Sequence, residues 1–261
     1  MTFHFRGLRT LLFVSALVTV SAYAADDPFV GTWKLEPNKI QFAGQVIEIK
    51  DLGGNRYVEN GSTPREYIAA GEDHPFPRGG TYSIDKESTD RWVFTYKHDG
   101  SVTGHNVWTL SNGGQQFKLE LKRTMADGSL YTQVESLSRV GSGSGFAGKW
   151  QTQTVEVTPL NFVIKPYGNN GLAFATPSSK EHQEMRFDGK DYPDLGPDVR
   201  PGDTSCAKRI DQHTIQMTKK LNGKVTSTQE WVVSPDGMTF TITSYATGQT
   251  KPIVEVFAKQ M

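Results

Sequence analysis

Carboxylates cluster in one loop of the chain, where they could hold a cation. The segment "DGKDYPDLGPDVRPGD" contains five aspartates: Asp188, Asp191, Asp194, Asp198 and Asp203. Calcium prefers oxygen ligands, but this spacing matches no EF-hand loop, and Lys190 and Arg200 dilute the negative charge. Aspartate is also common in turns, because its side chain hydrogen-bonds nearby backbone groups. We therefore predict a solvated loop without a metal, with calcium binding by the segment Asp188–Asp203 as the alternative.

Histidines beside carboxylates could act as general bases. In "KEHQE", His182 and Glu184 would share one face of a strand, while Glu181 would point to the other. A solvent-exposed pair is the simpler interpretation. His98 and His105 flank a turn, but no third ligand follows at the spacing of a zinc site.

Recognisable catalytic motifs are missing from the sequence. It contains no nucleophile elbow, zinc motif or phosphate-binding loop. The one cysteine, Cys206, cannot form an internal disulfide, and we interpret it as a small packed side chain. We therefore assign no catalytic residue, no cofactor and no metal, and favour a non-enzyme.

Composition limits the class of partner. The 261 residues carry a formal net charge of zero, whereas nucleic acids and anionic membranes require a basic surplus. At the N-terminus, Arg6 and Arg9 precede a short apolar run, and Ala22-Tyr23-Ala24 follows as a signal-peptidase site. We predict a signal peptide over 1–24, cleavage after Ala24, no membrane anchor, and a periplasmic or secreted protein.

Alternating apolar residues predict strands along the rest of the chain. In "QFKLELKR", Phe117, Leu119 and Leu121 fall on one face, and "TFTITSY" repeats the pattern with Phe240 and Ile242. Turn signals such as "HDG", "SNGG" and "LNG" separate these segments. The pattern predicts an all-β protein of antiparallel barrels with eight to nine strands each.

The chain also repeats itself. "FVGTWKLEP" at 29–37 returns as "FAGKWQTQT" at 146–154, and "SNGGQQF" at 111–117 returns as "SPDGMTF" at 234–240. A unit of about 120 residues is far longer than a solenoid repeat, so we interpret it as a duplicated domain. "RVGSGSG" at 139–145 would be a flexible linker. We divide the mature chain into 25–142 and 143–261.

The Gly-x-Trp motif at the start of each repeat resembles that of the lipocalin and fatty-acid-binding-protein group. The resemblance implies that the tryptophan closes one end of a barrel and that a basic side chain from the last strand crosses its ring. It implies the plug residues Gly31, Trp33, Arg139, Gly148, Trp150 and Lys259. We expect Trp33 to pair with Arg139, and Trp150 with Lys259.

The second half also resembles a family of exported bacterial proteins of unassigned function. It carries the family's "DGKDYP", "GKV" and "SPDGMTFT" segments, while "GEDHP" replaces the first of these in the other half. The matching loops would hold Asp73 and His74 in one copy and Asp191 and Tyr192 in the other. If these loops rim the barrel mouths, those four residues are candidate ligand-binding residues.

Three functions remain open. The first is an exported tandem-barrel protein that binds a small apolar or amphipathic molecule. The second is an isomerase, cyclase or lyase that uses the cavity without a metal. The third is a structural or partner-binding protein with filled barrels, which the small residues Thr241, Thr243 and Ser244 favour slightly for the second half.

Overall fold

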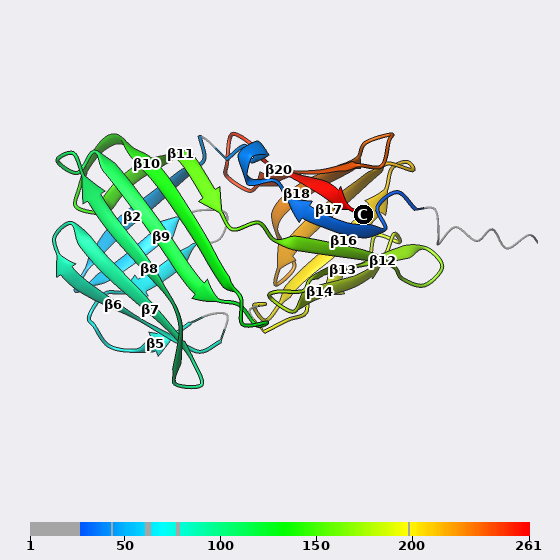
Figure 1. The fold of residues 1–261 in the computed structure, drawn as a ribbon. Coiled ribbons are helices and arrows are strands. Elements are labelled where there is room, and N and C mark those ends of the chain that lie inside the picture. Colours follow the sequence, from blue (N-terminus) through cyan, green and yellow to red (C-terminus); the bar gives the residue numbers. More distant parts are fainter. Residues whose placement is uncertain (1–26, 43, 61–63, 77–78, 198) are drawn as a thin grey trace, which may run out of the picture.

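Antiparallel strands joined by short turns make up the structure. The computed structural model describes residues 27–42, 44–60, 64–76, 79–197 and 199–261. Within these residues the only helix is the 3-10 helix η1 (Pro37–Lys39), and the strands form two ten-stranded sheets (Figure 1). The predicted all-β architecture of two barrels is confirmed, with ten strands per sheet in place of eight to nine. The predicted signal peptide lies outside the described residues.

One sheet is built from a single stretch of chain, and we call it the continuous barrel. Its strands are β2 (Val46–Gly53), β3 (Arg56–Asn60), β4 (Arg65–Ile68), β5 (His74–Pro75), β6 (Thr81–Ser88), β7 (Arg91–His98), β8 (Ser101–Ser111), β9 (Gln116–Thr124), β10 (Leu130–Ser144) and β11 (Ala147–Val157). β4 and β5 are the edge strands, and the Ile68 N–H donates to the Tyr82 hydroxyl across the gap beside them (3.0 Å).

The other sheet combines the first strand of the chain with its last nine, and we call it the split barrel. Its strands are β1 (Gly31–Leu35), β12 (Asn161–Pro166), β13 (Gly171–Thr176), β14 (Glu181–Arg186), β15 (Tyr192–Pro193), β16 (Asp203–Arg209), β17 (Thr214–Leu221), β18 (Lys224–Val233), β19 (Thr239–Ala246) and β20 (Ile253–Gln260). Two backbone hydrogen bonds between His182 and Leu195 join its edges.

The two repeats exchange their first strands. β1 lies between β12 and β20, although 25–142 was predicted to fold as one unit. β11 in turn lies between β2 and β10. The boundary at 142/143 therefore does not separate the two sheets. Figure 1 shows β1, drawn in blue, beside the red β20 in the right-hand barrel.

The Gly/Ser-rich segment is not the predicted flexible linker. It forms the end of β10, which pairs with β11 in a tight hairpin at Gly145. The chain instead crosses between barrels after η1, before β2 begins, and again at 158–160. Polar contacts reinforce the first crossing: Gln249 donates to the Val46 carbonyl (2.9 Å), and Gln45 donates to the Lys251 carbonyl (2.6 Å).

Hairpin turns follow the sequence signals. Asp99-Gly100 and Asn222-Gly223 have positive φ at both residues, as the tightest hairpin turns require. The strands between such turns alternate as predicted: Phe117 and Phe240 are fully buried at equivalent positions of β9 and β19. Each barrel therefore contains its own apolar core.

The two tryptophan plugs have the same local geometry. Trp33 and Trp150 are fully buried, and each indole N–H donates to the backbone carbonyl four residues earlier (2.8 Å). The predicted pairing with basic residues is wrong, because the first strands are exchanged. Lys259 lies over Trp33 (5.1 Å to the ring centroid) and Arg139 over Trp150 (4.0 Å).

The glycine of Gly-x-Trp makes room for that basic side chain. A Cβ at Gly31 would lie 2.9 Å from Cε of Lys259, and one at Gly148 would lie 2.5 Å from Nη1 of Arg139. Both glycines also have φ values that other residues rarely adopt, 149° and 138°. The motif thus positions a cation over the tryptophan ring, which explains why the chain contains it twice.

Candidate functional site

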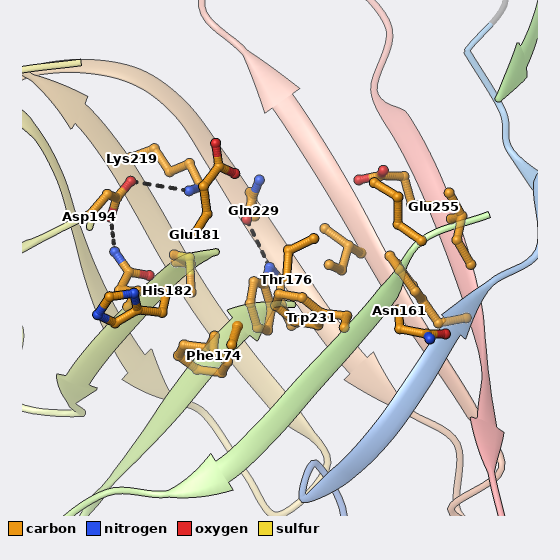
Figure 2. A pocket seen from close by; sticks show the side chains of 18 of the residues that line it. Asn161, Phe174, Thr176, Glu181, His182, Asp194, Lys219, Gln229, Trp231 and Glu255 are labelled. Atoms are coloured by element: carbon orange, nitrogen blue, oxygen red, sulfur yellow. Dashed lines mark hydrogen bonds and ion pairs between the residues drawn. The ribbon is translucent and has the colours of Figure 1, made fainter. Parts of the chain in front are cut away.

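A cavity of about 280 Å³ opens in the split barrel (Figure 2). Its apolar lining comes from strands on several sides of the barrel: Leu35, Phe162, Phe174, Met217, Trp231, Ile242 and Phe257. Its polar lining comprises Asn161, Thr176, Glu181, His182, Gln183, Asp194, Lys219, Gln229 and Glu255. The cavity is therefore amphipathic, as small-molecule sites commonly are.

Aromatic rings form one wall of the cavity. The Trp231 ring on β18 packs edge-on against Phe174 (centroids 4.8 Å apart) and Phe162 (5.6 Å). Its indole N–H donates to the Gln229 side chain (2.8 Å), so the only hydrogen-bond donor of this ring already has a partner. The wall therefore presents apolar faces that are held in place by strand register and ring contacts.

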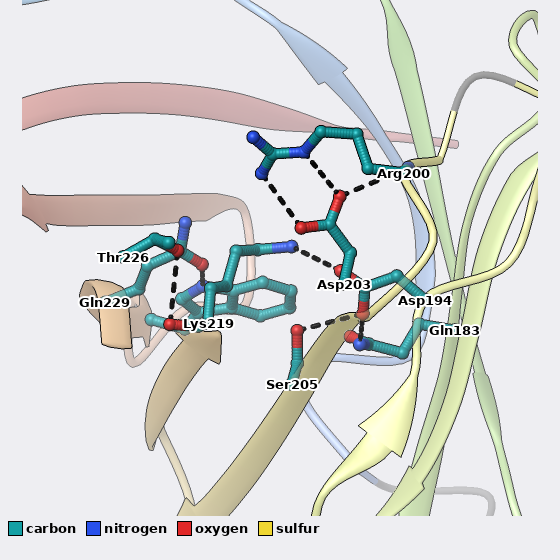
Figure 3. A network of polar contacts seen from close by, with 9 residues as sticks. Gln183, Asp194, Arg200, Asp203, Ser205, Lys219, Thr226 and Gln229 are labelled. Atoms are coloured by element: carbon teal, nitrogen blue, oxygen red, sulfur yellow. Dashed lines mark hydrogen bonds and ion pairs between the residues drawn. The ribbon is translucent and has the colours of Figure 1, made fainter. Parts of the chain in front are cut away.

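A polar network centred on Asp194 borders the cavity, since Asp194, Gln183 and Lys219 all line it (Figure 3). The Asp194 carboxylate accepts hydrogen bonds from the buried side chains of Gln183 and Ser205, the latter at 2.9 Å. Lys219 Nζ lies 3.4 Å from its other oxygen. Next to this network, Arg200 forms a two-pronged ion pair with Asp203 (2.8 and 3.0 Å). The network fixes the loop that carries Asp194 against β14, β16 and β17.

Glu255 has a different environment from Asp194. It is half-buried on β20, lines the cavity, and accepts no hydrogen bond from the described residues. Burial raises the pKa of its carboxyl group, and the nearby Lys219 opposes that rise. Glu255 therefore has capacity left for a ligand, and so does Glu181, whose carboxylate also lines the cavity and accepts no hydrogen bond from the described residues.

The continuous barrel contains larger side chains at equivalent positions. The strand registers match Gln183 with Tyr67, since each lies opposite an aromatic residue of the preceding strand. They also match Ser205 with Tyr82 and Lys219 with Tyr96. Ser205 lies opposite Lys219 on β16 and β17, as Tyr82 lies opposite Tyr96 on β6 and β7.

These aromatic rings fill the continuous barrel. Tyr67 packs against Tyr82 (6.1 Å), Phe94 (5.4 Å) and Trp108 (6.1 Å), and Phe76 packs against Tyr96 (5.3 Å). In the split barrel, Trp231 takes the position of Trp108, but the tyrosines are replaced by smaller or flexible polar residues. The cavity thus arises from substitution inside a shared framework.

A buried polar cluster occupies the end of the continuous barrel that corresponds to the cavity of the split barrel, since Tyr67 matches Gln183. Glu59 accepts hydrogen bonds from the Tyr67 hydroxyl (2.9 Å) and from Arg65 (3.0 Å). Burial raises the pKa of Tyr67, and the negative charge of Glu59 adds to that rise. These side chains satisfy one another and pack with the tyrosines, so this cluster is built for stability of the barrel end.

The four predicted ligand-binding residues do not line the cavity. Asp73 and Asp191 form equivalent ion pairs outside it, with Lys97 (2.8 Å) and Lys220 (2.7 Å). The His74 ring lies against Tyr82 (centroids 5.8 Å apart). The Tyr192 hydroxyl donates to Asp188 (3.0 Å). The structure therefore gives these residues contacts that hold the short strands β5 and β15 in place.

The other candidates from the sequence do not form one site, although Asp194 and His182 line the cavity. Among the described residues, no group of three or more His, Cys, Asp or Glu side chains is arranged to hold a metal ion. The aspartates of the acidic loop contact different partners, and Asp198 lies outside the described residues. His182 and Glu184 are exposed, as predicted, His105 contacts Thr95, and Cys206 is half-buried.

The expectation of a filled barrel in the second half is wrong, because the cavity lies there. Thr241 and Thr243 alternate with the buried Phe240 and Ile242, so they face outward and say nothing about the interior, whereas Ser244 shares the inward face but is too small to fill it. The cavity residues Glu255, Lys219 and Gln183 were missed. Strand alternation could have found Glu255, since it shares the inward face with Phe257 and Lys259.

Comparisons add no relative with this site: no family model matches the chain, and no curated protein is similar to it. In the described part of the chain, no helix is long and apolar enough to cross a membrane.

Proposed function

We propose that this protein is an exported tandem-barrel protein that binds a small amphipathic molecule in the cavity of the split barrel. The observation that carries the proposal is the contrast between the two barrels. At the positions where tyrosines pack the continuous barrel, the split barrel has polar side chains around an open space with an aromatic wall.

The size of the cavity limits the ligand. A volume of about 280 Å³ lies just below the usual range for small-molecule sites, roughly 300–1,000 Å³. A compact molecule with one aromatic or branched apolar part suits it better than a long chain. The apolar part would lie against Trp231 and Phe174, and the polar part would lie toward Lys219 and Glu255.

A pocket enzyme is the second candidate, and Glu255 is the observation that favours it. A carboxyl group whose pKa is raised by burial can act as a general acid or base near neutral pH. The two candidates differ in what happens to the bound molecule: a carrier releases it unchanged, whereas an enzyme releases a product.

Native mass spectrometry of the protein purified from its own host tests the proposal. We expect one small molecule per chain, which denaturation releases unchanged. The matched control is Ile242→Trp, which places a large ring into the cavity and should abolish the bound mass while far-ultraviolet circular dichroism stays native-like. A wild-type protein that never carries or takes up a small molecule, or a variant that retains it, would contradict the proposal.

A further inference from the structure

We infer that the ligand of the split barrel carries a cationic amine, which the Glu255 carboxylate holds beside the aromatic wall. This inference rests on the proposed function, because it specifies the ligand of that same cavity. It follows from three observations: the missing partner of Glu255, the charges that line the cavity, and the chemistry of the wall.

The first observation is that Glu255 lacks the hydrogen-bond donor that the equivalent glutamate of the continuous barrel, Glu135, has. Glu135 occupies the equivalent position in the continuous barrel, since it lies opposite Leu119 as Glu255 lies opposite Ile242. Glu135 accepts a hydrogen bond from Gln133, two residues earlier on the same strand (2.5 Å). The residue two before Glu255 is Ile253, which has no side-chain donor. An otherwise unpaired inward carboxyl group leaves a place for a donor from a ligand.

The second observation is the charge of the lining. Three carboxylates line the cavity, Glu181, Asp194 and Glu255, against the single ammonium of Lys219 and the imidazole of His182. Lys219 already contacts Asp194 (3.4 Å). An anionic ligand would therefore compete with Asp194 for that ammonium and would meet a negative surplus. A cationic ligand would reduce the surplus.

The third observation is the aromatic wall. Tryptophan is the residue whose ring attracts cations most strongly, and Phe162 and Phe174 pack against Trp231, while Phe257 also lines the cavity. Gln229 accepts the indole N–H and holds the ring in position. A carboxylate and aromatic rings that line the same cavity, as Glu255 and these rings do, are the combination that recognises amines and ammonium groups.

The same arrangement makes binding depend on pH. Lys219 on β17 opposes the rise in the pKa of Glu255, and Glu255 in turn raises the pKa of Tyr131 on β10 of the continuous barrel, while Glu181 and His182 on β14 line the same cavity. A bound ammonium favours the ionised form of Glu255. The affinity for an amine should therefore fall as the pH is lowered and Glu255 becomes protonated.

Calorimetric titration of the full mature chain with three probes of equal shape tests the inference: phenylbutylamine, phenylbutanol and phenylbutyrate at pH 7. We expect the amine to bind about tenfold more tightly than the alcohol, and the acid to bind most weakly. Glu255→Gln should remove the advantage of the amine, whereas Glu135→Gln, the matched control in the continuous barrel, should leave it unchanged. Lys219→Gln should increase the advantage, which provides a second, independent test.

The outcomes separate the two proposals. If the acid binds more tightly than the amine, or if Glu255→Gln and Lys219→Gln leave the preference unchanged, the inference is wrong and the proposed function stands. Equal binding of all three probes would likewise overturn the inference and leave the proposed function intact. If none of the probes binds and no other small molecule is carried from the host, both proposals fail.

Discussion

The two barrels share one end and differ at the other. At the shared end, Trp33 and Trp150 are buried with identical indole hydrogen bonds, and a basic side chain crosses each ring. At the other end, tyrosines fill the continuous barrel, while polar residues surround a cavity in the split barrel. The residues that define the fold and those that define the site are therefore separated along the barrel axis. This separation lets one barrel acquire a site without loss of its closed end.

The barrels differ in connectivity as well. The continuous barrel forms from residues 46–157, whereas the split barrel needs β1 from the start of the chain to fill the gap between β12 and β20. The barrel with the cavity is thus the one whose assembly depends on a distant strand, and loop closure over that distance carries an entropic cost. Substitutions in β1 should act on the split barrel although β1 belongs to the first repeat by sequence.

Replacement of the plug tryptophans should give the largest effect and tests the exchange of strands. Trp33→Ala and Trp150→Ala should each reduce the free energy of unfolding by about 3–5 kcal/mol, because each removes a fully buried ring. Hydrogen exchange measured by mass spectrometry should show that Trp33→Ala lowers protection in 161–260, and that Trp150→Ala lowers it in 46–143. The opposite assignment would mean that the first strands stay with their own repeats.

A second pair of substitutions tests whether only one barrel has free space. Leu119 and Ile242 are equivalent inward residues of β9 and β19. Leu119→Trp should cost about 1–3 kcal/mol because it overpacks a filled interior, whereas Ile242→Trp should cost less than about 1 kcal/mol because the ring enters the cavity. Urea denaturation of both variants measures the difference, and equal costs would show that the two interiors are filled to the same extent.

Removal of the basic residues that lie over the plug tryptophans should have a smaller effect on stability. Arg139 donates hydrogen bonds to the carbonyls of Gly114, Ala147 and Gly145, and it lies closer to its tryptophan than Lys259 does. Arg139→Ala should cost about 1–2 kcal/mol, and Lys259→Ala about 0.5–1 kcal/mol. Thermal unfolding provides the measurement. A larger loss for Lys259→Ala would reverse the proposed order of the two contacts.

The smallest expected effect concerns the pH dependence of the two equivalent glutamates. Burial raises the pKa of both Glu135 and Glu255 in the folded protein, and a hydrogen bond from Gln133 opposes the rise at Glu135 only. The ionisation of each glutamate therefore opposes folding. The protonated carboxyl group contributes fully to stability below the unfolded pKa of about 4.3, and this contribution is lost as the pH rises through the raised pKa of the folded protein.

Removal of the Glu255 charge should consequently stabilise the protein at high pH. Glu255→Gln should gain stability over the wild type between about pH 4 and pH 8, with no difference at the acidic end. Glu135→Gln should gain less, because it also disturbs the hydrogen bond from Gln133. Chemical denaturation across this range would contradict the account if Glu255→Gln were destabilising at pH 8.

Sequence patterns predicted the local features of the fold better than its connectivity. Alternation and turn residues identified strands such as β9 and turns such as Asn222-Gly223, because both depend on neighbouring residues. The exchange of β1 and β11 could not be predicted, because Trp33 and Trp150 have identical local signals and either basic residue could serve either ring. The choice depends on the lengths of the crossings, above all the tight hairpin between β10 and β11.

The site was harder to predict for a related reason. Loops rich in charged residues drew attention to Asp73, His74, Asp191 and Tyr192, whereas the cavity is lined from inside the barrel. Whether a position such as Gln183 opens a cavity depends on the size of side chains across the barrel, which alternation does not encode. Register comparison with Tyr67 makes the difference visible only once the strands are paired.

The central claim is that a ligand enters the split barrel and not the continuous one, and the indole signals of two equivalent tryptophans test it directly. Trp231 lines the cavity, and Trp108 is buried at the matching position of the continuous barrel. In a titration of the nitrogen-15-labelled protein with phenylbutanol, which carries no charge, we predict a saturable shift of the Trp231 indole signal and none for Trp108. A shift of Trp108 while Trp231 stays unchanged, or no shift of either at saturating probe, would contradict the account.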